Sequence, residues 1–117
     1  MSKRTLIRGA ALIWTVLIIL GAIFRGRALG KHLQTSGVAH FATHLMVFGI
    51  LGALLCLSYR RPAFRGYAVL FGLVLGLWTE TYEYLAFGSP MEYADVLSDA
   101  VGVLLGAGLA LLVQRRR

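Results

Sequence analysis

Long apolar runs alternate with short polar links along the whole 117-residue chain. A membrane's hydrocarbon core is ~30 Å thick, and a helix needs ~20 apolar residues to cross it. The pattern predicts four membrane-spanning helices, at roughly 9–24, 37–57, 67–87 and 95–113. Because these spans and their links use nearly every residue, we predict a single domain over 1–117. Its expected fold is an all-α, integral membrane four-helix bundle with the lipid bilayer as its partner.

Composition supports the membrane class and limits the partners. The chain is 58% hydrophobic and only 15% charged, with a mean hydropathy of +0.74. A soluble domain of this size could not cover so much apolar surface. The net charge of +7 comes from short basic clusters that flank the spans and are not interleaved with aromatic residues. We interpret these clusters as anchors facing anionic lipid headgroups, and we predict no nucleic-acid partner.

The positions of the basic clusters predict the orientation, because Lys and Arg concentrate in cytoplasmic segments. If both termini and the second link are cytoplasmic, nine of the twelve basic residues lie inside and three lie outside. The reverse orientation gives three inside and nine outside. We therefore predict that both termini are cytoplasmic.

The acidic and histidine residues gather in two parts of the chain. The five acids form one run, namely Glu80, Glu83, Glu92, Asp95 and Asp99. The histidines surround the start of the second span, namely His32, His40 and His44. The predicted topology places both groups on the outer side of the membrane. Ionisable groups within a membrane are costly to insert and usually functional, so the two runs predict a polar site.

Helix geometry indicates which polar side chains can meet. Residues three or four positions apart share a helix face. Three pairs satisfy this spacing, namely His40 with His44, Glu80 with Glu83, and Asp95 with Asp99. At a rise of 1.5 Å per residue, Glu80 and His44 should lie ~10 Å below the outer helix ends, and Asp99 ~6 Å below. We predict a funnel open to the outside, with these three residues at its floor.

Small residues continue the acidic faces and predict close helix packing. The third predicted helix carries Gly72 and Gly76 before Glu80, and the fourth carries Gly102 and Gly106 after Asp95. Small residues four apart let membrane helices approach closely. We therefore expect the glycine faces of the third and fourth helices to pack together and turn the carboxylates inward.

Several roles remain open for the polar residues. His40 and His44 could form structural hydrogen bonds between helices, or they could bind a divalent metal such as zinc or manganese together with carboxylates. The candidate metal ligands are His40, His44, Glu80 and Asp99. Asp95 could also cap the fourth helix, since a carboxylate at a helix start accepts backbone N–H groups. Glu92 is interpreted as a solvated loop charge.

Two stretches carry a family resemblance. They are HFATHLMVFGILG, which begins at His40, and ETYEYLAFGSPMEYADVLSDAVGVLLG, which begins at Glu80. Over residues 36–108 the chain resembles the VanZ-like family of small bacterial membrane proteins, and four of the family's positions are matched by His40, Glu80, Asp95 and Gly102. The chain departs from the pattern where Glu83 replaces Gln, Ser89 replaces a loop Arg, Asp99 replaces Asn, and His44 replaces a frequent Tyr.

The resemblance implies location in a bacterial inner membrane and a role at the extracytoplasmic face of that membrane. This role is linked to low-level resistance to teicoplanin, a lipid-bearing glycopeptide antibiotic. The implied target is a lipid-linked component of the cell envelope. If the protein is an enzyme, we expect Glu80 and Asp95 as acid/base or metal-holding groups and His40 as their partner. Glu83, Asp99 and His44 are then supporting binding residues. The reaction would be hydrolysis or transfer on a lipid phosphate or a glycan.

Two alternative functions remain. Four short helices with a membrane carboxylate cluster also describe small homodimeric, proton-coupled exporters. Those exporters carry their key Glu in the first helix, whereas the first helix here has no acid. The chain could instead be a non-catalytic assembly partner in which the acids pair with Arg25 or Arg27.

Overall fold

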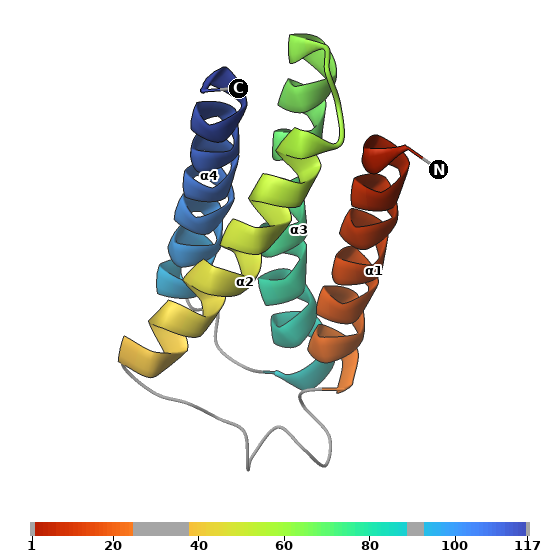
Figure 1. Ribbon diagram of the computed structural model, residues 1–117. Helices are drawn as coiled ribbons and strands as arrows, with labels where there is room; N and C mark the ends of the chain where they lie inside the picture. Colours follow the sequence, from red (N-terminus) through yellow and green to blue (C-terminus); the bar gives the residue numbers. More distant parts are fainter. Residues whose placement is uncertain (1, 25–37, 89–92, 117) are drawn as a thin grey trace.

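Four helices make up the fold in the computed structural model, which describes residues 2–24, 38–88 and 93–116 (Figure 1). Their bounds are α1 Lys3–Phe24, α2 Val38–Leu57, α3 Pro62–Phe87 and α4 Tyr93–Arg115. Successive helices alternate in direction, so the described ends of the chain and the link from α2 to α3 lie together at one end of the bundle. The predicted all-α fold with four helices is confirmed over these ranges.

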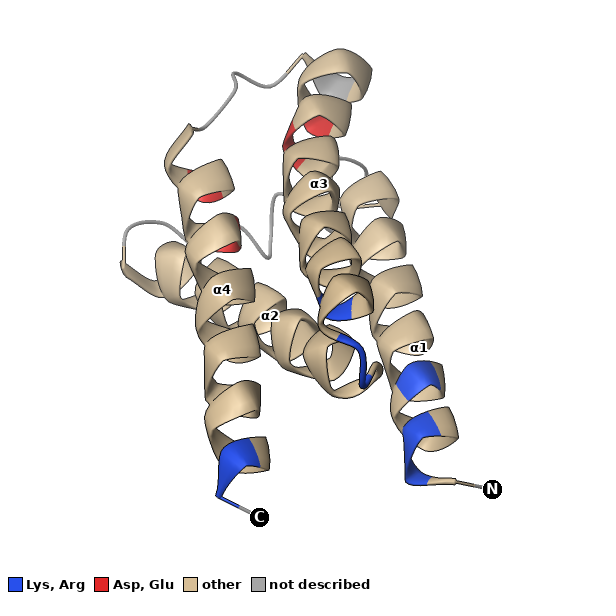
Figure 2. Ribbon diagram, turned by 90° about the horizontal axis from the view of Figure 1, so that it is seen from above, with Lys and Arg blue, Asp and Glu red and all other residues tan. Residues whose placement is uncertain are grey.

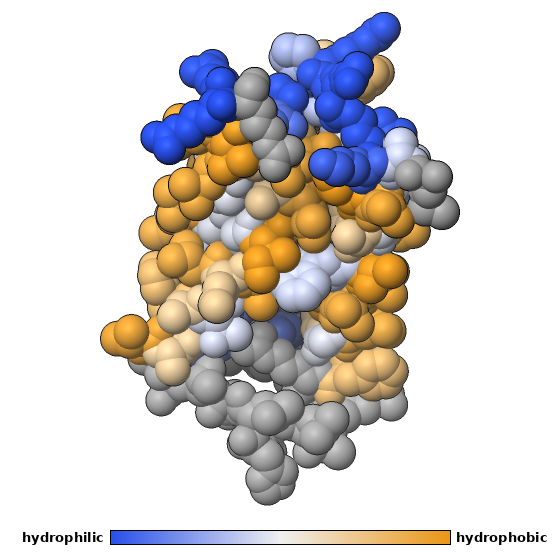
Figure 3. Space-filling view, viewed as in Figure 1, coloured by the Kyte–Doolittle hydropathy of each residue, from blue (hydrophilic) through white to orange (hydrophobic). Residues whose placement is uncertain are grey.

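Apolar side chains cover the flanks of the bundle. Each helix contains at least 18 consecutive residues apolar enough to cross a membrane. Many large apolar side chains are more than half exposed, as are Leu12 at 66%, Leu85 at 75% and Leu109 at 62%. Figure 3 shows the flank as largely hydrophobic, with hydrophilic side chains gathered at the end that carries the termini. Contiguous exposed apolar surface of this extent requires a nonpolar surrounding, so the chain is a multi-pass membrane protein.

Three helices begin earlier than the apolar pattern predicts. Helix α1 begins at Lys3, α3 at Pro62 and α4 at Tyr93, instead of at residues 9, 67 and 95. Polar residues at a membrane surface can still be helical, and a proline is well suited to the first helical position because its N–H would be unbonded there. Helix α3 ends where Gly88 takes a left-handed φ of 68°, and its N–H bonds to the Tyr84 carbonyl at 3.1 Å.

The closest helix contact joins α2 to α4. A Cβ atom added at Gly106 would overlap the carbonyl oxygen of Gly49, and one added at Gly102 would lie 2.6 Å from the carbonyl oxygen of Leu45. The prediction that the α4 glycines pack against α3 is therefore wrong. These glycines let the α2 backbone approach α4, because no side chain separates the two helices there.

Helix α3 covers the α2–α4 pair with its own glycines. A Cβ at Gly72 would lie 3.1 Å from the Val103 side chain, and one at Gly76 would lie 2.9 Å from the Cβ of Asp99. This half of the predicted packing is correct, since the α3 glycines do face α4. Helix α1 lies at the side of the bundle, where the Trp14 indole N–H donates to the Val47 carbonyl at 2.9 Å.

Arginines bind the C-terminal end of α2. The Nε–H of Arg8 donates to the Ser58 carbonyl at 3.0 Å, and the Nε–H of Arg65 donates to the Tyr59 carbonyl at 2.9 Å. A second nitrogen of Arg65 donates to the Gln114 side chain at 2.7 Å. The last carbonyls of a helix lack intrahelical partners and carry partial negative charge. Both carbonyls belong to residues just beyond the end of α2, and these bonds hold α1, α2, α3 and α4 together at this end.

Candidate functional site

Charge is separated along the bundle axis. Figure 2 shows the basic residues at the end that carries the termini and the acidic residues towards the other end. The described Lys and Arg residues are Lys3, Arg4, Arg8, Arg60, Arg61, Arg65, Arg115 and Arg116. The described acids are Glu80, Glu83, Asp95 and Asp99. From Asp99 to Arg115 the rise along α4 is ~24 Å, so the two groups lie nearly a membrane core apart.

Two histidine–aspartate pairs join α2 to α4. The Nε2 atom of His40 lies 3.0 Å from Oδ2 of Asp95, and the Nδ1 atom of His44 lies 2.7 Å from Oδ1 of Asp99. The 3.0 Å distance is that of an ordinary hydrogen bond, and the 2.7 Å distance is in the range of charge-assisted ones. The four residues named as site candidates on these two helices are thus brought together.

The pairing follows from helix direction and close approach. Each histidine is 55 residues from its aspartate. Because α2 and α4 run parallel, one turn along both helices moves from the first pair to the second. The aspartate side chain is short, so the two pairs can form only if the backbones of α2 and α4 lie close together. Gly102 lies about one turn after Asp99 along α4, and its missing side chain lets α4 approach the backbone of Leu45 on α2.

The two pairs form one connected cluster. The Nε2 atom of His44 lies 4.0 Å from Oδ2 of Asp95, and the two imidazole ring centroids are 4.6 Å apart. The order of contacts is Asp99, His44, Asp95 and His40, alternating carboxylate and imidazole. The 4.0 Å contact is longer than a hydrogen bond, so direct hydrogen bonding is confined to the pairs His40–Asp95 and His44–Asp99.

Burial confirms that the cluster lies within the bundle. Asp99 is 1% exposed and Asp95 is 6% exposed, while the side chains of His44 and His40 are 11% and 17% exposed. Asp99 is six residues beyond Tyr93, which places it ~9 Å along α4. It is deeper than the sequence predicts because α4 begins before residue 95. The cluster therefore runs from a more accessible His40 to a fully buried Asp99.

Helix α3 supplies a third carboxylate. Glu80 is 4% exposed and lies one turn beyond Gly76, the glycine that faces Asp99. Since α3 runs antiparallel to α4, that turn brings Glu80 level with Asp95. Glu83 lies nearer the end of α3 and is partly exposed. Glu80 is thus the α3 residue best placed to serve the cluster, as its spacing predicts.

Some sequence predictions are corrected or fall outside the described ranges. Asp95 is the third residue of α4, so it lies within the first turn and not at the N-cap position, and its carboxylate contacts His40. The described ranges do not include several residues considered above, namely Arg25, Arg27, His32, Ser89 and Glu92.

Within the described ranges, one group of donor atoms has the arrangement needed to hold a metal ion. One donor atom each from His40, His44 and Asp95 lie within 4.8 Å of one another. The predicted ligands Glu80 and Asp99 are not in this group, and the carboxylate in it comes from Asp95. Asp99 instead contacts the group through the second nitrogen of His44.

Sequence reasoning missed the residues that allow the pairs to form. Gly49 lies against the backbone of α4 at Gly102 and Gly106, and a Cβ at Gly52 would overlap the Val103 carbonyl. The signal was present as small residues on α2, since Gly49 and Ala53 are four apart. Ser98 was also missed. It is fully buried between the two aspartates in sequence, and its hydroxyl donates to the Asp95 carbonyl at 3.0 Å.

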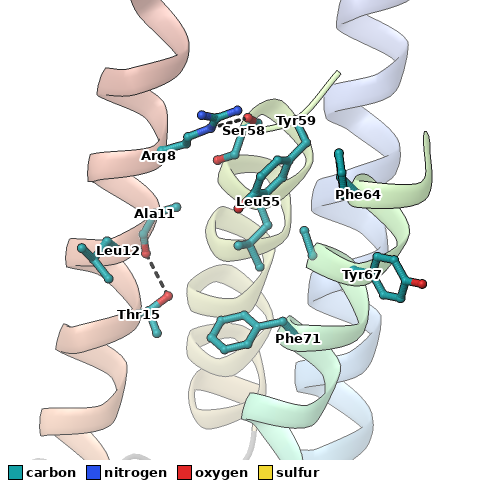
Figure 4. A pocket seen from close by; sticks show the side chains of 11 residues that line it. Arg8, Ala11, Leu12, Thr15, Leu55, Ser58, Tyr59, Phe64, Tyr67 and Phe71 are labelled. Carbon is teal, nitrogen blue, oxygen red and sulfur yellow. Dashed lines mark hydrogen bonds between the residues drawn. The ribbon is translucent and has the colours of Figure 1, made fainter. Parts of the chain in front are cut away.

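A separate pocket lies at the opposite end of the bundle (Figure 4). It encloses about 500 Å³ between α1, the end of α2 and the start of α3. Its lining is mostly apolar, with Arg8, Ser58 and Tyr59 near the basic end. None of the acidic or histidine residues lines this pocket, so it is distinct from the polar cluster.

Comparisons of the chain with protein-family models, with curated proteins and with solved structures find no match.

Proposed function

We propose that this chain is a VanZ-like protein of the bacterial inner membrane that acts at the extracytoplasmic face on a lipid-linked component of the cell envelope. The observation that carries the proposal is the buried cluster of two histidine–aspartate pairs. Its members include His40 and Asp95, two positions that match the family pattern. The third matching residue, Glu80, is buried at the same level on α3.

The charge distribution supports the orientation. All Lys and Arg residues in the described ranges lie at the end with the termini, as expected of the cytoplasmic side. With that end inside, the site lies in the outer part of the membrane. A lipid-linked substrate could enter the site from the outer leaflet while its headgroup remains near water.

The geometry supports acid–base chemistry at that face. The carboxylate of Asp95 orients the His40 imidazole through their 3.0 Å contact. A histidine held by a carboxylate can remove a proton from an attacking hydroxyl or water and return it to a leaving group. Glu80 supplies a second carboxyl group at the same level. Hydrolysis or transfer at a lipid phosphate or glycan requires this kind of proton handling.

Proton-coupled export is less well supported. Small exporters of this kind carry their key Glu in the first helix, whereas α1 contains no Asp, Glu or His. Within the described helices, the basic half of the bundle contains no Asp, Glu or His. A homodimeric exporter and a non-catalytic assembly partner therefore remain as alternatives that a functional assay separates from the proposal.

Teicoplanin susceptibility in a sensitive bacterial host tests the proposed function. We expect the wild-type chain to raise the inhibitory concentration, and Glu80→Gln or Asp95→Asn to return it to the vector level. Both substitutions keep the side-chain shape and remove a carboxylate needed for proton handling. Thr43→Val is the matched control, because Thr43 is exposed on α2 next to His44 and its hydroxyl donates only to the Ala39 carbonyl.

All variants should be compared at equal membrane levels, with vancomycin as a second drug. Resistance that survives both carboxylate substitutions would contradict a role for the cluster. Absence of resistance from folded wild-type protein would contradict the proposed envelope role and make drug export the next assay.

A further inference from the structure

We propose that His40, His44 and Asp95 bind a Zn²⁺ ion, with Asp99 orienting His44 from behind. The inference rests on the proposed function in one respect, since it concerns the same polar cluster. It goes beyond that function because acid–base chemistry at the cluster requires no metal. With Zn²⁺ bound, His40 and Asp95 would be ligands, and a metal-bound water and Glu80 would handle the proton in their place. It also reverses the metal roles expected from the sequence, since Asp95 is the ligand and Asp99 only orients His44.

The separations between donor atoms fit tetrahedral zinc. Zinc bonds to imidazole nitrogen and carboxylate oxygen at ~2.0–2.2 Å, which places neighbouring tetrahedral ligands ~3.3–3.5 Å apart. In the structure Asp95 Oδ2 lies 3.0 Å from the Nε2 of His40 and 4.0 Å from the Nε2 of His44. These separations bracket the required value. The separation between the two histidine donors is within 4.8 Å, so the rings would have to rotate to bring all three donors around one ion.

The contact of Asp99 selects the nitrogen that His44 offers. Its Oδ1 atom lies 2.7 Å from Nδ1 of His44, so Nδ1 donates its proton there. The lone pair of a neutral imidazole is then on Nε2, the nitrogen on the side of Asp95. Histidine ligands of zinc commonly bond through their other nitrogen to a carboxylate, which orients the ring and raises its basicity. Asp99 has this position.

The ligand set resembles that of catalytic zinc sites more than that of structural ones. Structural zinc sites in proteins are closed by four side chains, often cysteines, whereas catalytic sites use three protein ligands and leave the fourth position for water or substrate. The only cysteine, Cys56, is buried near the other end of α2. Three protein ligands would leave one tetrahedral position for water or substrate. A zinc ion there would polarise a bound water or a phosphate oxygen.

Metal binding to the purified full-length protein tests the inference directly. Chelator-treated protein in detergent would be titrated with Zn²⁺ by calorimetry, and with Co²⁺ to record the visible absorption of tetrahedral cobalt. We expect one ion per chain, with the intense cobalt bands of a tetrahedral site. Asp95→Asn and His44→Gln should each abolish the bands. Asp99→Asn should keep them but weaken binding ~10–100-fold, since it removes only the orienting carboxylate. Thr43→Val should bind like wild type.

Helical circular dichroism and a single size-exclusion peak would establish that each variant is folded. Stoichiometric binding that Asp95→Asn leaves unchanged would overturn the inference, as would an absence of binding by folded wild-type protein. Equal loss from Asp99→Asn and Asp95→Asn would overturn the separate role given to Asp99. Teicoplanin resistance without metal binding would contradict the zinc site and support the metal-free acid–base function. Metal binding without resistance would support the zinc site and contradict the proposed envelope function.

Discussion

Gly106→Leu is expected to prevent the bundle from folding. A Cβ at this position would already overlap the carbonyl oxygen of Gly49, which belongs to the rigid α2 backbone. Side chains can rotate away from an intruding group, but a helix backbone can yield only if α2 and α4 separate. Overpacking of a core costs ~1–3 kcal/mol and sometimes more, and we expect a loss of at least about 3 kcal/mol here because the obstacle is backbone.

Gly108 is the matched control for this substitution. It lies two residues further along α4, is exposed, and has nothing within 4 Å of an added Cβ. Gly108→Leu should change stability by less than ~0.5 kcal/mol, as is usual for substitutions away from packed contacts. The measurement is the amount of monodisperse protein after detergent extraction, together with its thermal unfolding midpoint. Equal behaviour of the two variants would contradict the close α2–α4 contact.

His44→Leu is expected to lower the free energy of unfolding by about 3 kcal/mol, because removing one member of a buried charged pair leaves the other without its partner. The buried residue in this case is Asp99, which is 1% exposed. Adding Asp99→Asn should recover part of the loss, since it removes the buried charge at nearly constant shape. The double variant should therefore be more stable than His44→Leu alone, and yet inactive in the susceptibility assay.

The four proteins of this double-mutant cycle would be compared by urea or thermal unfolding in one detergent. We expect a coupling energy of ~1.5–3 kcal/mol, the range for hydrogen bonds to charged groups. Strictly additive effects would show that His44 and Asp99 do not interact. Full resistance from the double variant would show that the pair is a structural link without a functional role.

Local patterns predicted the helices and the polar faces. Apolar runs identify membrane spans because bilayer thickness sets their length. The four-residue spacing of His40 with His44 and of Asp95 with Asp99 fixed the side of each helix that would be polar. These features depend on the residues of one helix alone, and therefore they could be found without knowing how the helices pack.

The residues of one helix alone do not show which helix packs against the glycines of α4. Gly102 and Gly106 indicate where a second backbone can approach α4, but any neighbouring helix satisfies that condition. The short link between the third and fourth helices favoured α3, whereas α2 occupies the position. The matched four-residue spacings on α2 and α4 were the stronger signal, because two parallel helices with that spacing can form both histidine–aspartate pairs at once.

The sequence predicted only one of the two roles of the basic residues. Arg8 and Arg65 have the positions of membrane anchors, and their side chains also donate to backbone carbonyls just after α2. Backbone carbonyls are present at every residue, so no sequence signal marks which of them an arginine will reach. The same limitation applies to Asp95, whose position near a helix start is equally suitable for a cap and for an interhelical pair.

The orientation of the site is the claim on which the envelope function depends, and cysteine labelling in intact bacterial cells tests it most directly. The native thiol would be removed as Cys56→Ala. Tyr93→Cys would place a thiol at the exposed start of α4 beside the site, and Arg60→Cys would place one at the exposed basic end. A membrane-impermeant maleimide is then added before and after permeabilisation.

We expect the cysteine at position 93 to react in intact cells and the cysteine at position 60 to react only after permeabilisation. That result would place the histidine–aspartate pairs on the extracytoplasmic side, where a lipid-linked envelope component can reach them. Labelling at position 60 alone in intact cells would put the site on the cytoplasmic side and contradict the proposed function.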